Sequence, residues 1–94
     1  MTFEWDETKE RINIQKHGLD FKQAAHVWDD PWRIEFWDET HSLEELRFIT
    51  IGIINDQLTV VTVAYTERFE TIRIISARRA TKSEKEAYYS DGIL

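Results

Sequence analysis

The sequence predicts an α+β domain in which helices pack against an antiparallel sheet. Capped helical segments lie near the N-terminus, whereas β-branched runs separated by three to five residues fill the middle of the chain. Spacers this short favour antiparallel neighbours, because a parallel crossover needs about a dozen residues or more. The 94 residues, 41% of them hydrophobic, suffice for one modest core, so we expect a single domain over residues 1–94.

Capping residues delimit two helices near the N-terminus. Asp6 predicts an N-cap and Gly18 a stop for the first helix, which is largely polar with a narrow buried stripe at Ile12. Asp20, followed three residues later by a glutamine, predicts a second N-cap, and apolar residues then recur at helical spacing until Pro31. The second helix is therefore expected to be the better buried.

Four strand-like runs and a last helix complete the pattern. The first run begins near residue 33, and the other three span residues 46–54, 58–65 and 71–77. A hairpin turn is expected at residues 55–57. With the alternating start at 3–5, they predict a four-stranded antiparallel sheet plus a short N-terminal strand. A capping-box pattern from Thr81 to Glu84 predicts a C-terminal helix from Lys82 to about Tyr89. We expect the helices on one face of the sheet.

Composition excludes several classes of protein. Cysteine is absent, which excludes disulfides, thiolate metal sites and thiol nucleophiles. The chain has neither a leader-like start nor a long apolar run, so we expect a cytoplasmic protein that does not contact a membrane. No glycine-rich phosphate-binding motif or serine-hydrolase motif occurs, and we expect no cofactor.

The net charge of -6 is unevenly distributed. Residues 20–45 include eight acidic and two basic side chains, whereas residues 66–85 include six basic and three acidic ones. This division allows a basic surface for RNA and an acidic surface for a cationic partner. It is equally consistent with two solvated faces that bind nothing.

Two further groups are better explained structurally than as ligand sites. An acidic loop has hard metal-ligand types without a known metal-binding spacing, so we expect it to be solvated: Asp38, Glu39, His41, Glu44 and Glu45. Three tryptophans are able to stack nucleic-acid bases, but burial in the core is the commoner fate and is expected for them: Trp28, Trp32 and Trp37.

Two tracts resemble signatures of the BrnT family of bacterial toxin ribonucleases. The first is residues 5–21, and the second joins Tyr65-Thr66-Glu67-Arg68 to residues 72–80. Short matching segments lie between them in the expected order: Asp29-Asp30-Pro31, His41-Ser42 and Thr50-Ile51-Gly52. The resemblance extends from Phe3 to Tyr88, nearly the whole chain.

The resemblance implies a type II toxin with a RelE-like fold that cleaves mRNA without a metal and so inhibits translation. It also implies a BrnA-like antitoxin with a ribbon-helix-helix part. The toxin would then meet DNA only through this antitoxin, with a toxin–antitoxin heterotetramer as one form of assembly.

The resemblance, rather than residue spacing, selects the candidate site residues. It points to four catalytic residues, Lys9, Glu67, Arg68 and Arg79, and we expect Arg78 and Lys82 to bind RNA. Metal-free RNA cleavage needs a base for the 2′-hydroxyl and cations around the pentacoordinate phosphorus, roles suited to a glutamate and to arginines. The competing interpretation is that these arginines only pair with nearby glutamates on a solvated surface.

A second hypothesis is a binding module without enzymatic activity. Such a family member would keep its antitoxin interface and act only in a repressor complex. The acidic stretch and the bulky Phe69, expected at a hairpin tip, favour it.

Overall fold

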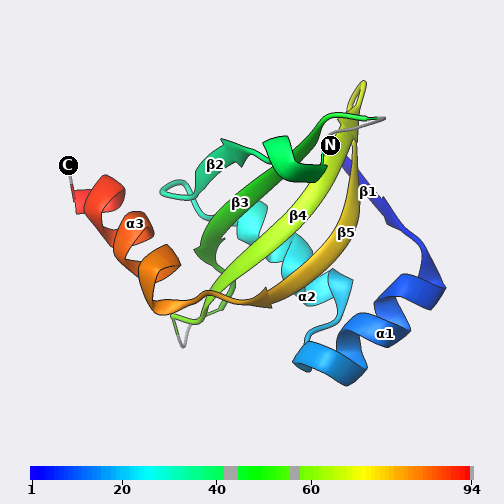
Figure 1. Cartoon of the computed structure of the whole chain (residues 1–94), viewed down its shortest axis with the longest axis horizontal. Helices are drawn as coiled ribbons and strands as arrows, with labels where there is room; N and C mark the ends of the chain where they lie inside the picture. Colours follow the sequence, from blue (N-terminus) through cyan, green and yellow to red (C-terminus); the bar gives the residue numbers. More distant parts are fainter. Residues whose placement is uncertain (42–44, 56–57, 94) are drawn as a thin grey trace.

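The computed structural model, which describes residues 1–41, 45–55 and 58–93, contains one five-stranded sheet flanked by helices (Figure 1). In chain order the elements are β1 (Thr2–Trp5), α1 (Glu7–His17), α2 (Phe21–Ala25), the 3-10 helix η1 (His26–Asp29), β2 (Ile34–Trp37), the 3-10 helix η2 (Glu39–His41), β3 (Arg47–Ile53), β4 (Val60–Arg68), β5 (Thr71–Arg79) and α3 (Lys82–Ile93). The predicted α+β class is confirmed. Among the described residues, no helix is long and apolar enough to cross a membrane.

The sheet has the strand order β1-β5-β4-β3-β2. β2, β3, β4 and β5 form the predicted antiparallel meander. β1 adds to the other side of β5 in parallel, which departs from a purely antiparallel sheet. A parallel pairing is feasible here because most of the chain separates β1 from β5. Residues 56 and 57 of the predicted hairpin turn lie outside the described residues.

The predicted helix boundaries near the N-terminus are confirmed. The Asp6 carboxylate accepts hydrogen bonds from the backbone N–H groups of Thr8 and Lys9 at 2.8 and 3.1 Å. Gly18 ends α1 in the left-handed conformation, with φ of 69°. Asp20 begins α2 through the predicted capping box, but the helix tightens into η1 at His26. The apolar run therefore forms two short helical pieces instead of one continuous α-helix.

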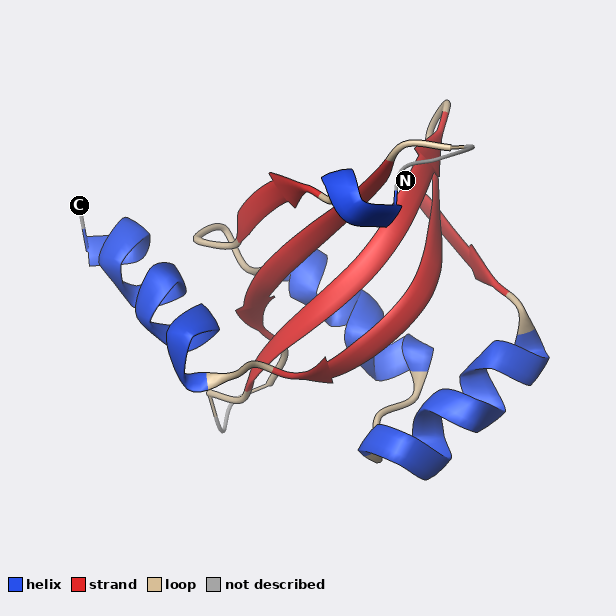
Figure 2. Ribbon diagram, in the orientation of Figure 1, coloured by secondary structure: helices blue, strands red, loops and turns tan. Residues whose placement is uncertain are grey.

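The helices lie on both faces of the sheet, so the prediction that they share one face is wrong. α2 and η1 lie behind the sheet in Figure 2 and cover what we call the helix-covered face, whereas α1 lies beside the β5 edge. α3 instead packs on the opposite face, where Tyr88 meets Ile51 and Val60. Those two side chains point away from α2 by strand alternation, because the neighbouring Gly52 and Val61 face it. The apolar surface at this end of the sheet explains where α3 docks.

Aromatic rings fill the core beneath α2 and η1. Trp28 makes edge-to-face contacts with Phe3 and Tyr65 at centroid distances of 5.2 and 4.9 Å. Trp32 and Trp37, however, are 62% and 55% exposed, so their predicted burial is wrong. Both flank or end the edge strand β2, which has a neighbour on one side only.

A buried asparagine, instead of the predicted apolar stripe, fixes α1 to the sheet. Ile12 is 47% exposed, whereas Asn13 is 5% exposed. The Asn13 amide donates to the Ala77 carbonyl at 2.8 Å and accepts from the Ala77 N–H at 3.1 Å, as a neighbouring strand would. It also donates to the Leu19 carbonyl at 3.0 Å, which holds the turn after α1. One side chain thereby satisfies both backbone groups of a buried residue in β5.

Replacing this asparagine should destabilise the fold strongly. Asn13→Ala leaves the N–H and C=O of the fully buried Ala77 unpaired, which costs about 2 to 4 kcal/mol of unfolding free energy. Ile12→Ala, on the exposed side of the same helix, should cost less than about 1 kcal/mol. Urea denaturation followed by circular dichroism measures both values. Equal losses in the two variants would contradict the assigned role of Asn13.

Candidate functional site

Four arginines of the described strands share the face of the sheet opposite α2. Arg47 on β3 pairs with Thr66 on β4, which in turn pairs with Arg73 on β5. The other two are Arg68, next to the β4–β5 turn, and Arg78, which pairs with Thr62. Since residues paired across strands point to the same side, these four side chains form one surface, which we call the arginine face.

The arginine face includes a hollow of about 290 Å³. Its floor is formed by alternate residues of the three central strands, of which Ala64 and Ser76 are small enough to leave space. Arg47 and Arg78 line the hollow with guanidinium groups, and Asp38 lines it with a carboxylate. Thr62 also lines it, but its hydroxyl hydrogen is donated to Glu84. This pair of guanidinium groups in a shallow depression suits a phosphate.

Arg78 is held in place by Glu84 from the first turn of α3. Its Nη1 and Nη2 donate to the two oxygens of the Glu84 carboxylate at 2.7 and 2.9 Å. The same carboxylate accepts from the Thr62 hydroxyl at 3.0 Å and from the Thr81 N–H at 2.8 Å. The Arg78 guanidinium, together with these hydrogen bonds, lowers the pKa of Glu84 to about 2 despite partial burial. Nη1 also donates to the Arg79 carbonyl at 3.4 Å, so three of the five N–H donors of Arg78 are used in orienting it.

Carboxylates also accompany the two arginines closer to the β4–β5 turn. Arg68 pairs with Glu45, and its hydrogen bond lowers the pKa of that carboxyl. Arg73 pairs with Glu4 on β1, with the Nη1 and Oε1 atoms 3.5 Å apart. Arg68 and Arg73 remain 65% and 41% exposed, so water or a ligand can reach both groups. At this end of the arginine face, each guanidinium is therefore balanced by a carboxylate in a weak, exposed ion pair.

The six residues singled out by the resemblance do not form one cluster. Arg68 and Arg78 lie on the arginine face, whereas the neighbouring Glu67 and Arg79 point toward the helix-covered side. Glu67 pairs with Ile72 and Arg79 with Val61, so six residues of β4 separate their positions, about 20 Å. No single phosphate can contact both of these side chains.

Lys9 and Lys82 lie at two further places. Lys9 is exposed on α1, one turn before Asn13, and α1 runs in the same general direction as β5 (Figure 1). It is therefore displaced from Asn13 toward the start of β5, away from Arg79. Lys82 is exposed at the start of α3, two residues before Glu84.

The hollow includes residues that sequence reasoning did not select. Arg47, Thr62 and Ser76 were assigned no role, although the alternation of 47 and 49 and of 62 and 64 would have placed each pair on one side of its strand. Their meeting with Arg78 depends on strand order and register, which the alternation alone does not provide. Among the described residues there is no group of three or more potential metal ligands. Glu44 and the side chain of His41, both of the predicted acidic loop, lie outside that description.

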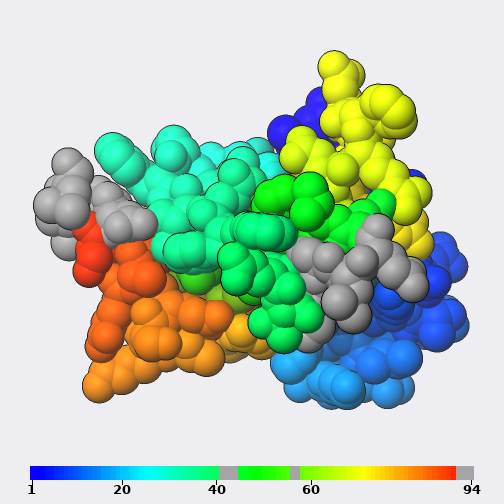
Figure 3. Space-filling model, turned by 45° about the horizontal axis from the view of Figure 1, so that its top comes forward, coloured from blue at the N-terminus to red at the C-terminus, as the bar shows by residue number. Residues whose placement is uncertain are grey.

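The space-filling view separates the main surfaces of the molecule. Figure 3 shows the tip of the β4–β5 hairpin, in yellow, projecting from the body, with α3 in orange and α1 in blue at opposite ends. Phe69 at this turn is fully exposed and has a φ of 57°. The predicted position of a bulky residue at the hairpin tip is thus confirmed.

Residues 5–84 match the family model described as the ribonuclease toxin BrnT of type II toxin–antitoxin systems. The chain belongs to the BrnT family. The match covers the helix-covered face, all of the arginine face and the first turn of α3. No protein with a curated function matches the sequence significantly. Membership places the chain among the ribonuclease toxins that are paired with an antitoxin.

The Arg78–Glu84 pair predicts a loss of stability in acid. The folded-state pKa of Glu84, about 2, is below its ordinary value of 4.5, so the stabilisation is complete above pH 4.5 and is lost as the pH falls toward 2. We expect Glu84→Gln to flatten the pH dependence of unfolding in this window by about 1 to 2 kcal/mol, after allowance for solvent screening. Thermal melting of both proteins between pH 2 and 7 tests this, and parallel curves would contradict it.

Proposed function

We propose that this BrnT-family chain is a metal-independent endoribonuclease that cleaves mRNA in the cytoplasm, inhibits translation and is neutralised by its antitoxin. The observation that carries the proposal is the arginine face, a group of four cations on one side of an otherwise acidic protein. Arginine binds phosphate with planar, paired donors, and the weak, exposed ion pairs of Arg68 and Arg73 allow a phosphate to replace the carboxylate.

The arginine face supplies the positioning and electrostatic parts of the reaction. A phosphate in the hollow would receive hydrogen bonds from Arg47 and Arg78, which can stabilise the charge that develops on the pentacoordinate phosphorus. Arg68 and Arg73 would bind neighbouring phosphates of the strand. Fixing the orientation of Arg78 before RNA binds limits the reorganisation that cleavage requires.

Proton transfer is assigned to one of two carboxylates. Glu67 is the base that the resemblance indicates, and Asp38 is the candidate that lines the hollow. Glu84 is a poor base because its pKa is only about 2. Thr62 and Glu67 are five residues apart on β4, about 17 Å, so the two candidates imply different positions for the scissile phosphate. Lys9 and Arg79 would act in cleavage only if it occurs away from the hollow.

The experiment is cleavage of a long single-stranded RNA by the purified protein in the presence of a chelator. If the hollow is the site, Arg47→Ala and Arg78→Ala should each reduce the cleavage rate by about 100-fold or more. Arg79→Ala, a matched arginine on the other side of the same strand, should then change the rate less than about threefold. Circular dichroism checks that each variant is folded.

Other outcomes have distinct meanings. Loss of cleavage in Arg79→Ala and Lys9→Ala, with full activity in Arg47→Ala, would refute the hollow and favour the residues indicated by the resemblance. Asp38→Asn and Glu67→Gln then distinguish the two proposed bases. If purified toxin cuts RNA only when ribosomes are added, the same variants are compared in that assay.

A repressor module without activity is the second candidate function. Carboxylates of the same chain pair with Arg68, Arg73 and Arg78, which favours this alternative. A protein that binds its antitoxin but leaves RNA intact, with and without ribosomes, would establish it.

RNA binding should also depend on salt through the arginine face. For single-stranded nucleic acid, the logarithm of the binding constant falls with the logarithm of the salt concentration, with a slope of about -0.7 per neutralised phosphate. Arg73→Gln, which retains a polar side chain, should therefore reduce the magnitude of that slope by about 0.7. Fluorescence anisotropy of a labelled RNA measures the slope, and Lys22→Gln on α2 is the control expected to leave it unchanged.

A further inference from the structure

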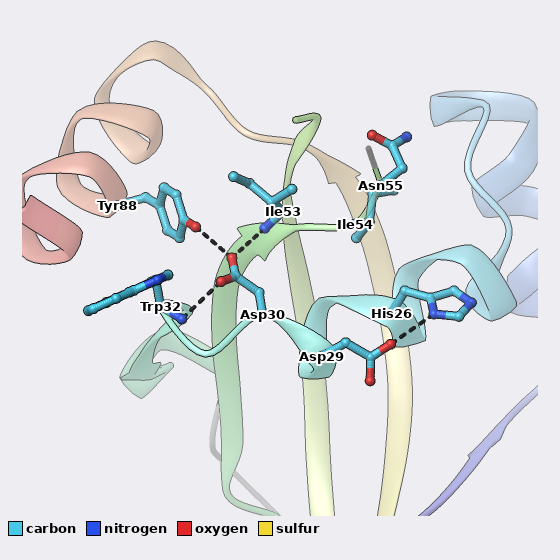
Figure 4. Close-up of a pocket in the computed structure, with 8 residues that line it drawn as sticks. All are labelled: His26, Asp29, Asp30, Trp32, Ile53, Ile54, Asn55 and Tyr88. Atoms are coloured by element: carbon cyan, nitrogen blue, oxygen red, sulfur yellow. Dashed lines mark hydrogen bonds and ion pairs between the residues drawn. The ribbon is translucent and has the colours of Figure 1, made fainter. Parts of the chain in front are cut away.

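A separate pocket of about 260 Å³ lies between η1, the loop before β2, the end of β3 and α3 (Figure 4). Small-molecule sites usually begin at about 300 Å³, so this pocket is better suited to one inserted side chain than to a free metabolite. The argument depends on four of its lining residues: Asp29, Asp30, Trp32 and Tyr88.

Asp30 forms the inner wall of the pocket and joins three elements. Its Oδ2 atom accepts from the Ile53 N–H at 2.8 Å and from the Tyr88 hydroxyl at 2.6 Å, while Oδ1 accepts from the Trp32 N–H at 2.9 Å. Burial raises the pKa of this carboxyl, but the three hydrogen bonds outweigh that effect and hold the pKa below its ordinary value. Asp30 is thus a fixed negative charge at neutral pH.

The pocket has no cationic side chain of its own to balance this charge. Neither lysine nor arginine is among the described residues that line it. Arg33 lowers the pKa of Asp30 through its charge, but its Nη1 contacts Glu35 at 2.9 Å and its guanidinium lies over Trp28, outside the pocket lining. Asp29, whose side chain is 79% exposed, contacts only His26 among the described residues, at 3.0 Å. The two carboxylates of the pocket therefore face only His26 and the more distant charge of Arg33, so the pocket presents negative charge to its opening.

An exposed aromatic ring lies on the Tyr88 side of Asp30, whereas Asp29 lies on the other side next to His26 (Figure 4). Trp32 is 62% exposed, and Figure 4 shows its indole extending from the loop beneath the helix that carries Tyr88. Tryptophan is enriched among the hot-spot residues of protein interfaces. A planar guanidinium can stack on an indole while it donates to a carboxylate, which a compact ammonium does less well.

We propose that this pocket binds an arginine side chain of the antitoxin. The proposal depends on the antitoxin partner of the proposed function, but not on RNA cleavage. The acidic segment 20–45, which includes both aspartates, supplies the complementary charge for a cationic partner. A second copy of this chain fits less well, because a dimer about this pocket would bring two acidic segments together.

The test is calorimetric titration of the purified toxin with its antitoxin. Trp32→Ala and Asp29→Asn should each weaken the complex by about tenfold or more, and the charge reversal Asp29→Lys should weaken it further. Phe69→Ala removes a fully exposed aromatic ring at the far hairpin tip and should leave the affinity within about twofold. A double-mutant cycle between Asp29→Asn and each antitoxin arginine replaced by alanine should identify one strongly coupled arginine.

The result that overturns the proposal is unchanged affinity in Trp32→Ala and Asp29→Asn, or a cycle in which no antitoxin arginine is coupled to Asp29. Self-association of the toxin that Trp32→Ala abolishes, seen by analytical ultracentrifugation, would also overturn it, because the occupant would then be a second copy. Free Trp32→Ala toxin should cleave RNA at the wild-type rate. If neither the wild-type toxin nor the variant cleaves RNA, the proposed ribonuclease activity is contradicted. The calorimetric affinity for the antitoxin still tests the pocket independently of cleavage.

Discussion

The arginine face depends on one extra residue in β5. Tyr65 pairs with Ile74 and Ala64 with Ser76, so Ile75 has no partner of its own in the register. Such a bulge reverses the alternation of the strand beyond it. Arg73 and Arg78 would otherwise point to opposite sides, because five residues separate them. The bulge brings both to one face and, on the other side, keeps Ile74 and Ala77 together in the core.

This bulge marks the limit of what the sequence could predict. The strands, their order along the chain and the helix caps at Asp6 and Asp20 follow from local patterns, and the structure has all of them. Strict alternation places Arg73 on the side of β5 away from Ile72, as observed, but does not relate it to Arg78. Without the register between β3, β4 and β5, the sequence does not show that Arg47 lies on the same face as Arg73 and Arg78.

The predictions of how the helices pack on the sheet were wrong because polar side chains, rather than apolar ones, attach these helices. α1 has no adequate apolar stripe, and Asn13 attaches it by completing the hydrogen bonds of β5, which no periodicity indicates. Likewise α3 is held by Glu84 and Tyr88, whose partners Arg78 and Asp30 are distant in sequence or on another element. The capping-box pattern predicts a helix there, but not the face of the sheet on which it docks.

Two side chains of α3, Glu84 and Tyr88, connect the arginine face with the acidic pocket. Glu84 and Tyr88 are four residues apart, hence on the same side of the helix, and one touches the arginine face while the other closes the acidic pocket. The distribution of charge in the sequence is thereby given a structural form: cations concentrate on the central strands and anions around η1 and β2. A net charge of -6 would repel RNA if it were spread evenly. Because the charges are separated in this way, one small domain can have both an RNA-binding face and a surface for a cationic protein.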